Sequence, residues 1–489
     1  MDRKMIVPTV GIARCKEARY PSLPPYSPNR VFPELVFLPA GSINPVDGNP
    51  VYEEIRQSFF LAGWDTQNYG SERWNPLGEF IRPGSQILIK PNFVLHEYSP
   101  SVKDCLVTHG SIIRVALDYA FLAGGATCHI TIADAPEQVA DFNRILEQTG
   151  LPEIVAFYRD RLNFKIDVFD LRTVASDWDG ERGFLPPNRR LSGDPHGYVD
   201  IDLGSQSALE PITQSATRFG IANYSRASLQ ERHKPAHHEY LVSRSVLEAD
   251  TVISLPKMKT HEKAGLTGAL KSFVGINGCK DWLPHYRLGS ERSGGDEHPG
   301  GQWTVGANRA VKEKLQRRSA QVWSGASKVW SILRTLTPAS SSLPSGAWYG
   351  NDTIWRMILD LNRILIFSDR NGCLCDRPQR QSCFIVDGII AGEGNGPLSP
   401  TPKRAGVVIA GDDPVAIDIV LAQLMGYDWR KLPLLSQFSL PNDDSQFTKF
   451  DGENIRAVTE TGVWNFDKLE SMGFVPPKGW KNYIELVRG

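Results

Sequence analysis

Short apolar runs alternate with longer amphipathic stretches along most of the chain. The runs typical of buried strands are 85–94, 126–136, 251–256 and 382–390. The stretches with apolar residues at helical spacing are 51–64, 109–125 and 352–367, and residues 405–426 predict a strand, a turn and a helix in succession. Strands that alternate with amphipathic helices predict an α/β fold, with a mainly parallel sheet and helices on both faces.

The chain of 489 residues is expected to form a single large α/β unit, interrupted in two places. Residues 171–240 are polar and predict a loop-rich cap or connection, and residues 286–350 predict an insertion. Within that insertion, residues 307–336 combine tryptophans with lysines and arginines, which predicts a basic amphipathic helix or helix pair. Such a helical insertion can pack on its own protein, cover a site as a lid, or lie on an anionic membrane surface. Residues 431–489 are expected to form a C-terminal extension.

Composition narrows the class of protein. The formal net charge is −1, so a generally basic surface for nucleic acid is excluded and any basic site must be local. No run approaches the roughly 18 apolar residues that a membrane-spanning helix needs. The seven cysteines are scattered and odd in number, which favours a reducing cytoplasm over a disulfide framework. We expect a cytoplasmic protein, with contact to the inner membrane through 307–336 as an open alternative.

Polar and charged side chains follow several of the predicted strands. Ligands of parallel α/β sheets bind beyond the carboxyl ends of the strands, where loops converge. We therefore expect one cleft there that binds a small anionic ligand, and Asp387 with Glu393 could hold a divalent cation in it. Each residue could instead cap a helix or shape a turn, as "GDDP" at 411–414 does well. The candidates at strand ends are Lys90, Asn92, Asp134, Lys257, Lys259, His261, Asp387, Glu393 and Asn395.

The stretch 256–287 gathers five lysines and two histidines directly after an apolar run. Thr267 lies near the expected start of a helix, where free amide hydrogens and nearby lysines suit a carboxylate or a phosphate. His261 and His285 could act as general acid and base. Crowded lysines have lowered pKa values and can serve as base or nucleophile, for which Lys259 and Lys271 are the leading candidates. Lys280 is a further candidate for holding the anion.

Several motifs together resemble a known family, the domain-of-unknown-function 362 family (DUF362). The motifs are "LIKPN" (88–92), "TH" (108–109, which adds His109 to the candidates), "ADAP" (133–136), "LEADTVISLPKMKTH" (247–261), "GLTGALKSFVGINGCKDWLPH" (265–285), "IVDGIIAGEGNGP" (385–397) and "GDDPVAIDIVLAQLMG" (411–426). The resemblance covers roughly residues 85–430, a core of the α/β unit, and implies a prokaryotic cytoplasmic protein. Many relatives carry a ferredoxin-type segment, but this chain has no C-x2-C-x2-C-x3-C run, so no iron–sulfur cluster is expected. The longer form with an insertion resembles a subgroup associated with genes of envelope polysaccharide metabolism.

Two classes of function fit these features. The first is an enzyme that acts on a hydroxy acid, a sugar acid or a phosphorylated sugar, by proton transfer such as racemisation or epimerisation, with or without a metal. Lysines would hold the anion and the two histidines would move protons. The second is a non-catalytic binding or carrier protein for an anionic ligand or a metal-bound cofactor, and an iron–sulfur redox protein is less favoured. The sequence favours the enzyme.

Overall fold

The computed structural model describes residues 7–179, 183–184, 189–221, 226–300, 343–439, 448, 450, 454–464 and 470–486. The basic helix expected at 307–336 lies outside these residues, and it stays a prediction. Among the described residues, no helix is long and apolar enough to cross a membrane.

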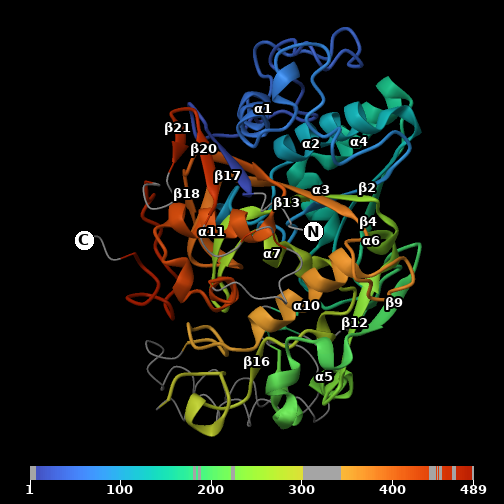
Figure 1. Ribbon diagram of the computed structural model, residues 1–489. Coiled ribbons are helices and arrows are strands. Elements are labelled where there is room, and N and C mark those ends of the chain that lie inside the picture. The colour runs from blue at the N-terminus through green and yellow to red at the C-terminus, as the bar shows by residue number, and fades with distance from the viewer. Residues whose placement is uncertain are drawn as a thin grey trace, which may run out of the picture.

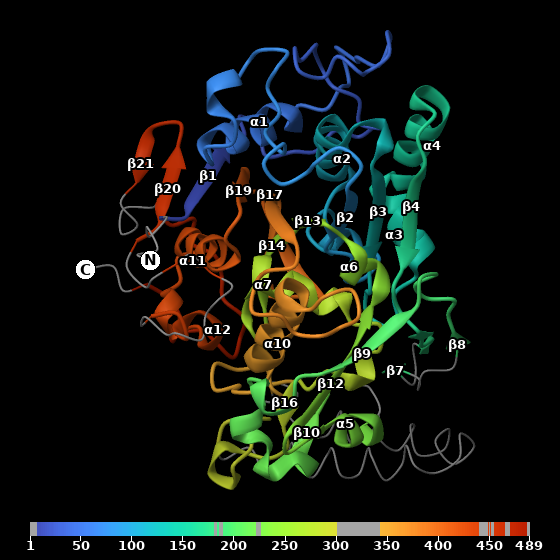
Figure 2. The same cartoon turned by 45° about the vertical axis from the view of Figure 1, so that its right-hand side comes forward.

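A large mixed sheet forms the centre of the molecule, with twelve strands among the described residues. Its main path, visible from one edge to the other in Figure 2, is β21 (Gly462–Trp464), β20 (Arg456–Thr459), β1 (Thr9–Arg14), β19 (Val407–Gly411), β17 (Gln381–Asn395), β13 (Thr251–Leu255), β2 (Gln86–Pro91), β3 (His129–Asp134) and β4 (Ile166–Asp170). Off this path lie β14 (Lys257–His261), β15 (Gly265–Thr267) and β18 (Ser399–Lys403).

Five neighbouring strands, from β17 through β13, β2 and β3 to β4, run parallel to one another. Strand β19 is antiparallel to both of its neighbours, β17 and β1, and β20 is again parallel to β1. Parallel neighbours need long crossovers, which the helices between these strands provide. The predicted α/β fold with a mainly parallel sheet is confirmed.

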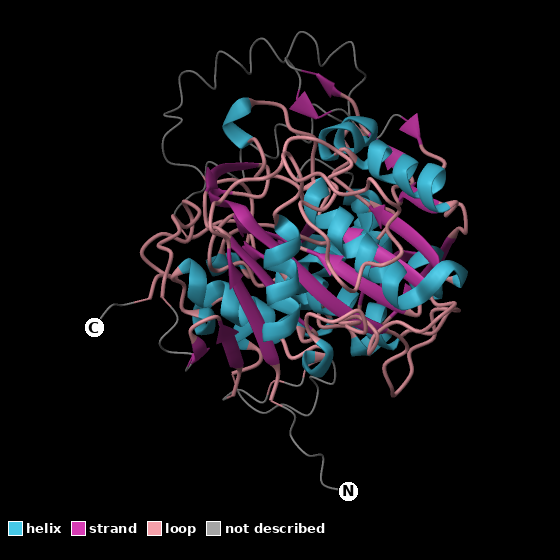
Figure 3. Ribbon diagram, turned by 90° about the horizontal axis from the view of Figure 1, so that it is seen from above, coloured by secondary structure: helices cyan, strands magenta, loops and turns pink. Residues whose placement is uncertain are grey.

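Helices cover both faces of the sheet because successive side chains of each strand point to opposite sides. Ile87 and Ile89 of β2 belong to one buried cluster, together with residues of α1 (Val51–Leu61), α2 (Gly110–Gly124) and α4 (Leu151–Leu162). Leu88, between them, belongs to the opposite cluster, with α10 (Ile354–Phe367) and α11 (Pro414–Met425). Figure 1 shows these two layers, and Figure 3 shows the strands side by side from above.

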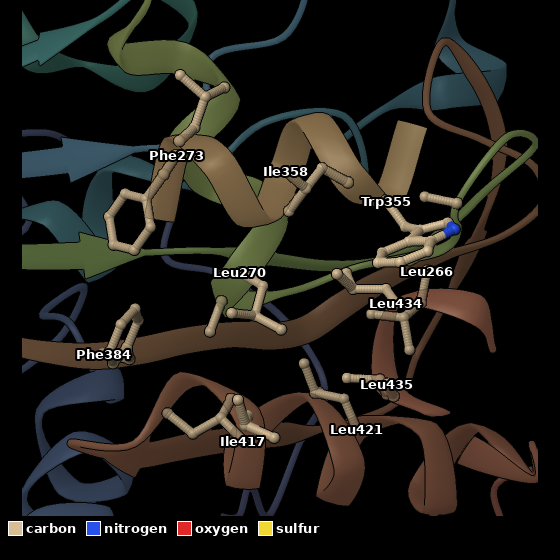
Figure 4. Packing of buried hydrophobic residues seen from close by; sticks show 14 of the residues in the cluster. Leu266, Leu270, Phe273, Trp355, Ile358, Phe384, Ile417, Leu421, Leu434 and Leu435 are labelled. Atoms are coloured by element: carbon tan, nitrogen blue, oxygen red, sulfur yellow. The ribbon is translucent and has the colours of Figure 1, made fainter. Parts of the chain in front are cut away.

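The second layer contains the short helix that matters most for the site, α7 (Ala269–Ser272). Leu270 and Phe273 pack with Ile358 of α10 and Ile417 of α11, and Figure 4 shows these side chains between the two longer helices. Burying each such side chain contributes about 1.5–3 kcal/mol. The apolar core therefore fixes the backbone that carries Lys271.

Helix ends follow the expected chemistry. Helix α11 begins after Asp413, whose Oδ1 accepts hydrogen bonds from two main-chain N–H groups at 3.0 and 2.9 Å, and it ends at Gly426 in the left-handed conformation. Helix α2 begins after His109, whose Nδ1 accepts from the Ser111 N–H at 3.1 Å. The capping role that "GDDP" favours is confirmed for Asp413.

Smaller elements lie around the main sheet. A three-stranded sheet contains β9 (Tyr198–Asp202), β11 (His233–Lys234) and β12 (His237–Ser243), and β10 (Phe219–Gly220) pairs with β16 (Tyr286–Arg287). Two further pairs are β5 (Val174–Ala175) with β8 (Arg189–Arg190), and β6 (Trp178–Asp179) with β7 (Gly183–Phe184). The remaining α-helices of the described residues are α3 (Phe142–Thr149), α5 (Arg226–Arg232), α6 (Arg244–Glu248) and α12 (Pro433–Ser436).

Candidate functional site

The order of the parallel strands identifies where a ligand would bind. From β2 the chain continues through β3 to β4 on one side, whereas β13 and β17 lie on the other side of β2. The direction of winding therefore changes between β13 and β2. Ligands of open α/β sheets bind at the carboxyl ends of the strands at such a point.

A pocket lies at this position, with a cavity volume of about 70 Å³. Its walls come from the segment after β2, the segment after β3, the end of β14, and the chain from α7 to residue 285. Six residues predicted from the sequence line this pocket, and Glu137 and Ser272 join them. The polar and charged lining residues are Asn92, Asp134, Glu137, His261, Lys271, Ser272, Lys280 and His285.

A buried ion pair lies at one wall of the pocket, where Asp134 is a lining residue and Lys90 is not. Lys90 Nζ lies 2.8 Å from Asp134 Oδ1, and both side chains are almost fully buried. Asp134 also accepts hydrogen bonds from the main-chain N–H groups of Phe93 at 2.7 Å and Ala135 at 2.9 Å. A Cβ atom at Gly275 would lie 1.8 Å from Asp134 Oδ1, so only glycine fits against the pair. Lys90 thus neutralises Asp134 and is not free to hold an anion.

Two lysines supply positive charge to the pocket. Burial lowers the pKa of Lys271 and of Lys280 to about 8 each, and Glu137 partly counteracts this for both. Lys280 Nζ donates to the Val274 carbonyl oxygen at 3.1 Å. Lys271 Nζ has no hydrogen-bond acceptor among the described residues. Lys271 is therefore the cation best placed to bind an anion from solution.

The proton positions of His261 follow from its hydrogen bonds. Its Nδ1 accepts from the main-chain N–H groups of Lys263 and Ala264, at 3.1 Å each. A nitrogen that accepts carries no proton, so the neutral ring carries its proton on Nε2. Burial, and then the charge of Lys271, lower the pKa of His261 well below its ordinary value. His261 is a neutral hydrogen-bond donor through Nε2.

His285 adopts the opposite tautomer. Its Nδ1 lies 2.8 Å from the carbonyl oxygen of Leu283, an acceptor, so Nδ1 carries the proton. Burial, and then neighbouring lysines, lower the pKa of His285 to about 3, which leaves the ring neutral with a lone pair on Nε2. One pocket therefore has an imidazole that donates, one that accepts, and a lysine to which no described residue offers an acceptor.

The expected anion site at the start of α7 is occupied by the protein itself. Asp418 of α11 accepts hydrogen bonds from the N–H groups of Ala269 at 2.5 Å and Leu270 at 3.1 Å. Burial raises the pKa of Asp418 to about 7. Thr267, expected to bind the ligand here, is buried outside the pocket lining, and its Oγ1 has no partner. This expectation is wrong because an internal carboxylate caps the helix.

Three further candidates, Lys257, Asp387 and His109, form a separate buried cluster with Tyr20, a residue that sequence reasoning missed. Lys257 Nζ lies 3.0 Å from Asp387 Oδ2 and 2.7 Å from the Tyr20 hydroxyl, which donates to Asp387 Oδ1. The main-chain N–H of His109 also donates to Asp387 at 3.0 Å, and the His109 ring stacks on Tyr20 with 4.0 Å between ring centroids. These groups satisfy one another, and none of them lines the pocket.

Lys259 also lies outside the pocket lining. It is fully buried, its Nζ donates to the Leu106 carbonyl oxygen at 2.5 Å, and burial lowers its pKa well below the ordinary value. The structure thus separates the two lysines that the sequence favoured as bases. Lys271 faces the pocket and Lys259 stabilises the loop before α2.

The two carboxylates expected to share a cation do not come together. Asp387 is held by Lys257 and Tyr20, whereas Glu393 accepts from Lys403 Nζ at 3.0 Å and from the Val475 N–H at 3.0 Å. Asn395 is exposed and accepts from the Lys478 N–H at 3.2 Å. In the part of the chain that the structure describes, no group of three or more His, Cys, Asp or Glu is placed to hold a metal.

Comparisons with known proteins support the resemblance but assign no reaction. Residues 206–423 match the family model described as "Domain of unknown function (DUF362)". No curated protein matches the chain. A crystal structure of a protein from Thermotoga maritima is similar over 72% of this chain and 54% of its own, with 10% identity and a TM-score of 0.31. This chain therefore spans about half the length of that protein.

Proposed function

We propose that this chain, as a protein with a DUF362 domain, is an enzyme that transfers protons on a small anionic substrate bound in the pocket between the ends of β2, β3 and β14. The single observation that carries the proposal is the pair of opposite tautomers. His261 offers a proton on Nε2 and His285 offers a lone pair on Nε2, both on the wall of one pocket. Acid–base catalysis requires one group of each kind within reach of the same substrate.

Lys271 would hold the anionic group of the substrate. Its ammonium group is a compact charge with three donors, and no acceptor among the described residues competes for it. The bound anion would offset the lysine charges that lower the pKa of His285, so the imidazole becomes a stronger base when substrate is present. This coupling favours proton removal only in the occupied pocket.

His285 would then remove a proton from the substrate through Nε2. The Nε2–H of His261 would stabilise the negative charge that develops, by a hydrogen bond. Return of a proton to the other side of the same atom gives racemisation or epimerisation. Lys280, which lines the same pocket and has a pKa of about 8, could deliver that proton, so that Lys271 keeps its charge on the anion.

Hydrogen–deuterium exchange tests the proposal. The wild-type chain is incubated in D2O with small hydroxy acids, sugar acids and sugar phosphates, and loss of carbon-bound hydrogen is followed by NMR. Exchange should occur with at least one acid and be lost in His285→Gln and in His261→Gln. Both variants should still bind that acid, since Lys271 remains. Binding without exchange in the wild type would contradict catalysis and favour a carrier protein.

A further inference from the structure

The side chain of Asn92 ends in a buried acceptor for which the described residues supply no donor. Asn92 Oδ1 is buried and has no hydrogen-bond partner in the part of the chain that the structure describes, and the residue lines the pocket. Buried polar atoms in proteins are almost always hydrogen-bonded, so an exception on a pocket wall points to a group that the ligand supplies. The missing group must be a hydrogen-bond donor.

The main chain holds Asn92 firmly in place. Its N–H donates to Thr108 Oγ1 at 2.9 Å, and its carbonyl oxygen accepts from the Thr108 N–H at 3.2 Å. The Thr108 hydroxyl in turn donates to the carbonyl oxygen of Leu255, at the end of β13, at 2.6 Å. These bonds tie the segment after β2 to the end of β13. The backbone of Asn92 is therefore fixed at the point where the strand winding changes.

The net charge of the pocket suits a ligand that carries one negative charge. Lys90 is paired with Asp134, and Glu137 offsets one of the two cations Lys271 and Lys280. The two histidines are neutral, because burial lowers their pKa values. Among the lining residues and Lys90, one positive charge remains, and the nearby Lys263 is partly offset by its neighbour Glu262. This balance matches a carboxylate better than a phosphate dianion.

Size restricts the ligand further. A water molecule needs roughly 10–15 Å³ of such volume, so the cavity of about 70 Å³ holds about five to seven waters. A carboxylic acid of two to four carbon atoms has a similar number of non-hydrogen atoms. A phosphorylated sugar is far larger than this volume, and most of it would lie outside the pocket.

We infer that the substrate class of this pocket is a short hydroxy-carboxylate, with its carboxylate on Lys271 and its hydroxyl donating to Asn92 Oδ1. The inference rests on the proposed site and narrows its substrate. Asn92 is then the specificity-determining residue, because an acid without the hydroxyl leaves the buried acceptor unsatisfied. Sites built to bind a hydroxyl reject analogues that lack it.

Two matched pairs of acids test the inference by calorimetry on the full chain. The pairs are glycolate with acetate, and 2-hydroxypropanoate with propanoate. The wild type should bind each hydroxy acid about tenfold or more tightly than its partner. In Asn92→Leu the preference should vanish, with the affinity for acetate and propanoate unchanged, whereas Lys271→Met should lose both acids of each pair. Asn92→Ala serves as a second variant, should the leucine fold poorly.

The outcomes separate this inference from the proposed reaction. The role of Asn92 would be overturned if the wild type bound hydroxy and deoxy acids equally, or if the preference survived in both Asn92 variants. Either result would still support an anion site at Lys271. Absence of binding for all four acids would overturn the substrate class. If binding depends on Asn92 but no hydrogen exchange occurs, catalysis is refuted, and the short hydroxy-carboxylate remains supported as the bound ligand.

Discussion

Replacement of Lys271 by Met should make the protein more stable while abolishing its binding of small acids. Burial, with the charge of Lys280 among the smaller causes, lowers the pKa of Lys271 from 10.5 to about 8. A difference of this size corresponds to about 3.4 kcal/mol between the charged and neutral forms. Because the side chain keeps part of its surface exposed, solvent screening reduces the expected gain to about 1–2 kcal/mol at neutral pH.

The direction of the Lys271 pKa shift determines how the free-energy cost of its buried charge depends on pH. The unfolded chain binds the Lys271 proton more tightly than the folded chain does, so the cost of the buried charge is full below about pH 8. It shrinks as pH rises from about 8 toward 10.5 and is absent above that value. The difference in free energy of unfolding between Lys271→Met and the wild type should shrink over the same pH range. With an unfolding entropy of roughly 2.1 cal/mol/K per residue, its thermal midpoint at neutral pH should rise by only about 1–2 °C.

The assay is urea unfolding of the wild type and Lys271→Met, at about pH 7 and about pH 10. Comparison of the two chains at each pH cancels the titration of all other groups. Lys165→Met is the control, because this side chain is 84% exposed and its replacement should change the free energy of unfolding by less than about 0.5 kcal/mol. A Lys271→Met chain that is less stable than the wild type at neutral pH, or a difference that does not shrink with pH, would refute the reasoning.

Three further replacements test the buried polar groups by urea unfolding. Lys257→Met should lower the free energy of unfolding by about 3–5 kcal/mol, because Asp387 keeps its buried charge without a cation, and adding Asp387→Leu should restore most of the loss. Arg380→Met should cost about 3 kcal/mol, because four main-chain carbonyls at the ends of α6 and α10 lose their donor. Asp418→Ala should cost about 3 kcal/mol and weaken acid binding, because two N–H groups of α7 lose their acceptor. A loss below about 1 kcal/mol in any single variant would contradict the assigned contacts.

The fold could be predicted from the sequence because the parallel strands are apolar on both faces. The run "TVISL" of β13 is completely buried, and apolar residues of β2 alternate between two helical layers. Strand order could not be predicted, since apolar runs of similar composition do not specify their neighbours. The change of winding between β13 and β2, which locates the pocket, therefore emerged only from the structure.

The candidate site could be predicted from the sequence only in part. The lysines and histidines that follow β13 could be identified as candidates from their side-chain chemistry. Three of them, Lys271, His261 and His285, do line one pocket. Sequence reasoning could not tell which carboxylates already have partners. Asp387 is neutralised by Lys257, and Asp418, which follows a predicted strand end, takes the amide groups that were expected to hold a ligand.

Two residues escaped sequence reasoning because their signals were weak. Tyr20 lies far ahead of the core motifs in the chain, and only the folded structure brings its hydroxyl to Lys257. Glu137 follows directly after "ADAP", so its position just past a predicted strand end was a usable signal. An isolated acidic residue in a loop is, however, usually a solvated surface group.

Nitrogen NMR of the histidine rings tests the central claim most directly, because the two neutral tautomers and the charged form have different shifts. The chain would carry ¹⁵N in its histidines, and His261→Gln and His285→Gln would assign the two rings. At about pH 6–7 the account predicts both rings neutral, with the proton on Nε2 of His261 and on Nδ1 of His285. Two rings of the same tautomer, or either ring protonated on both nitrogens in that range, would contradict it.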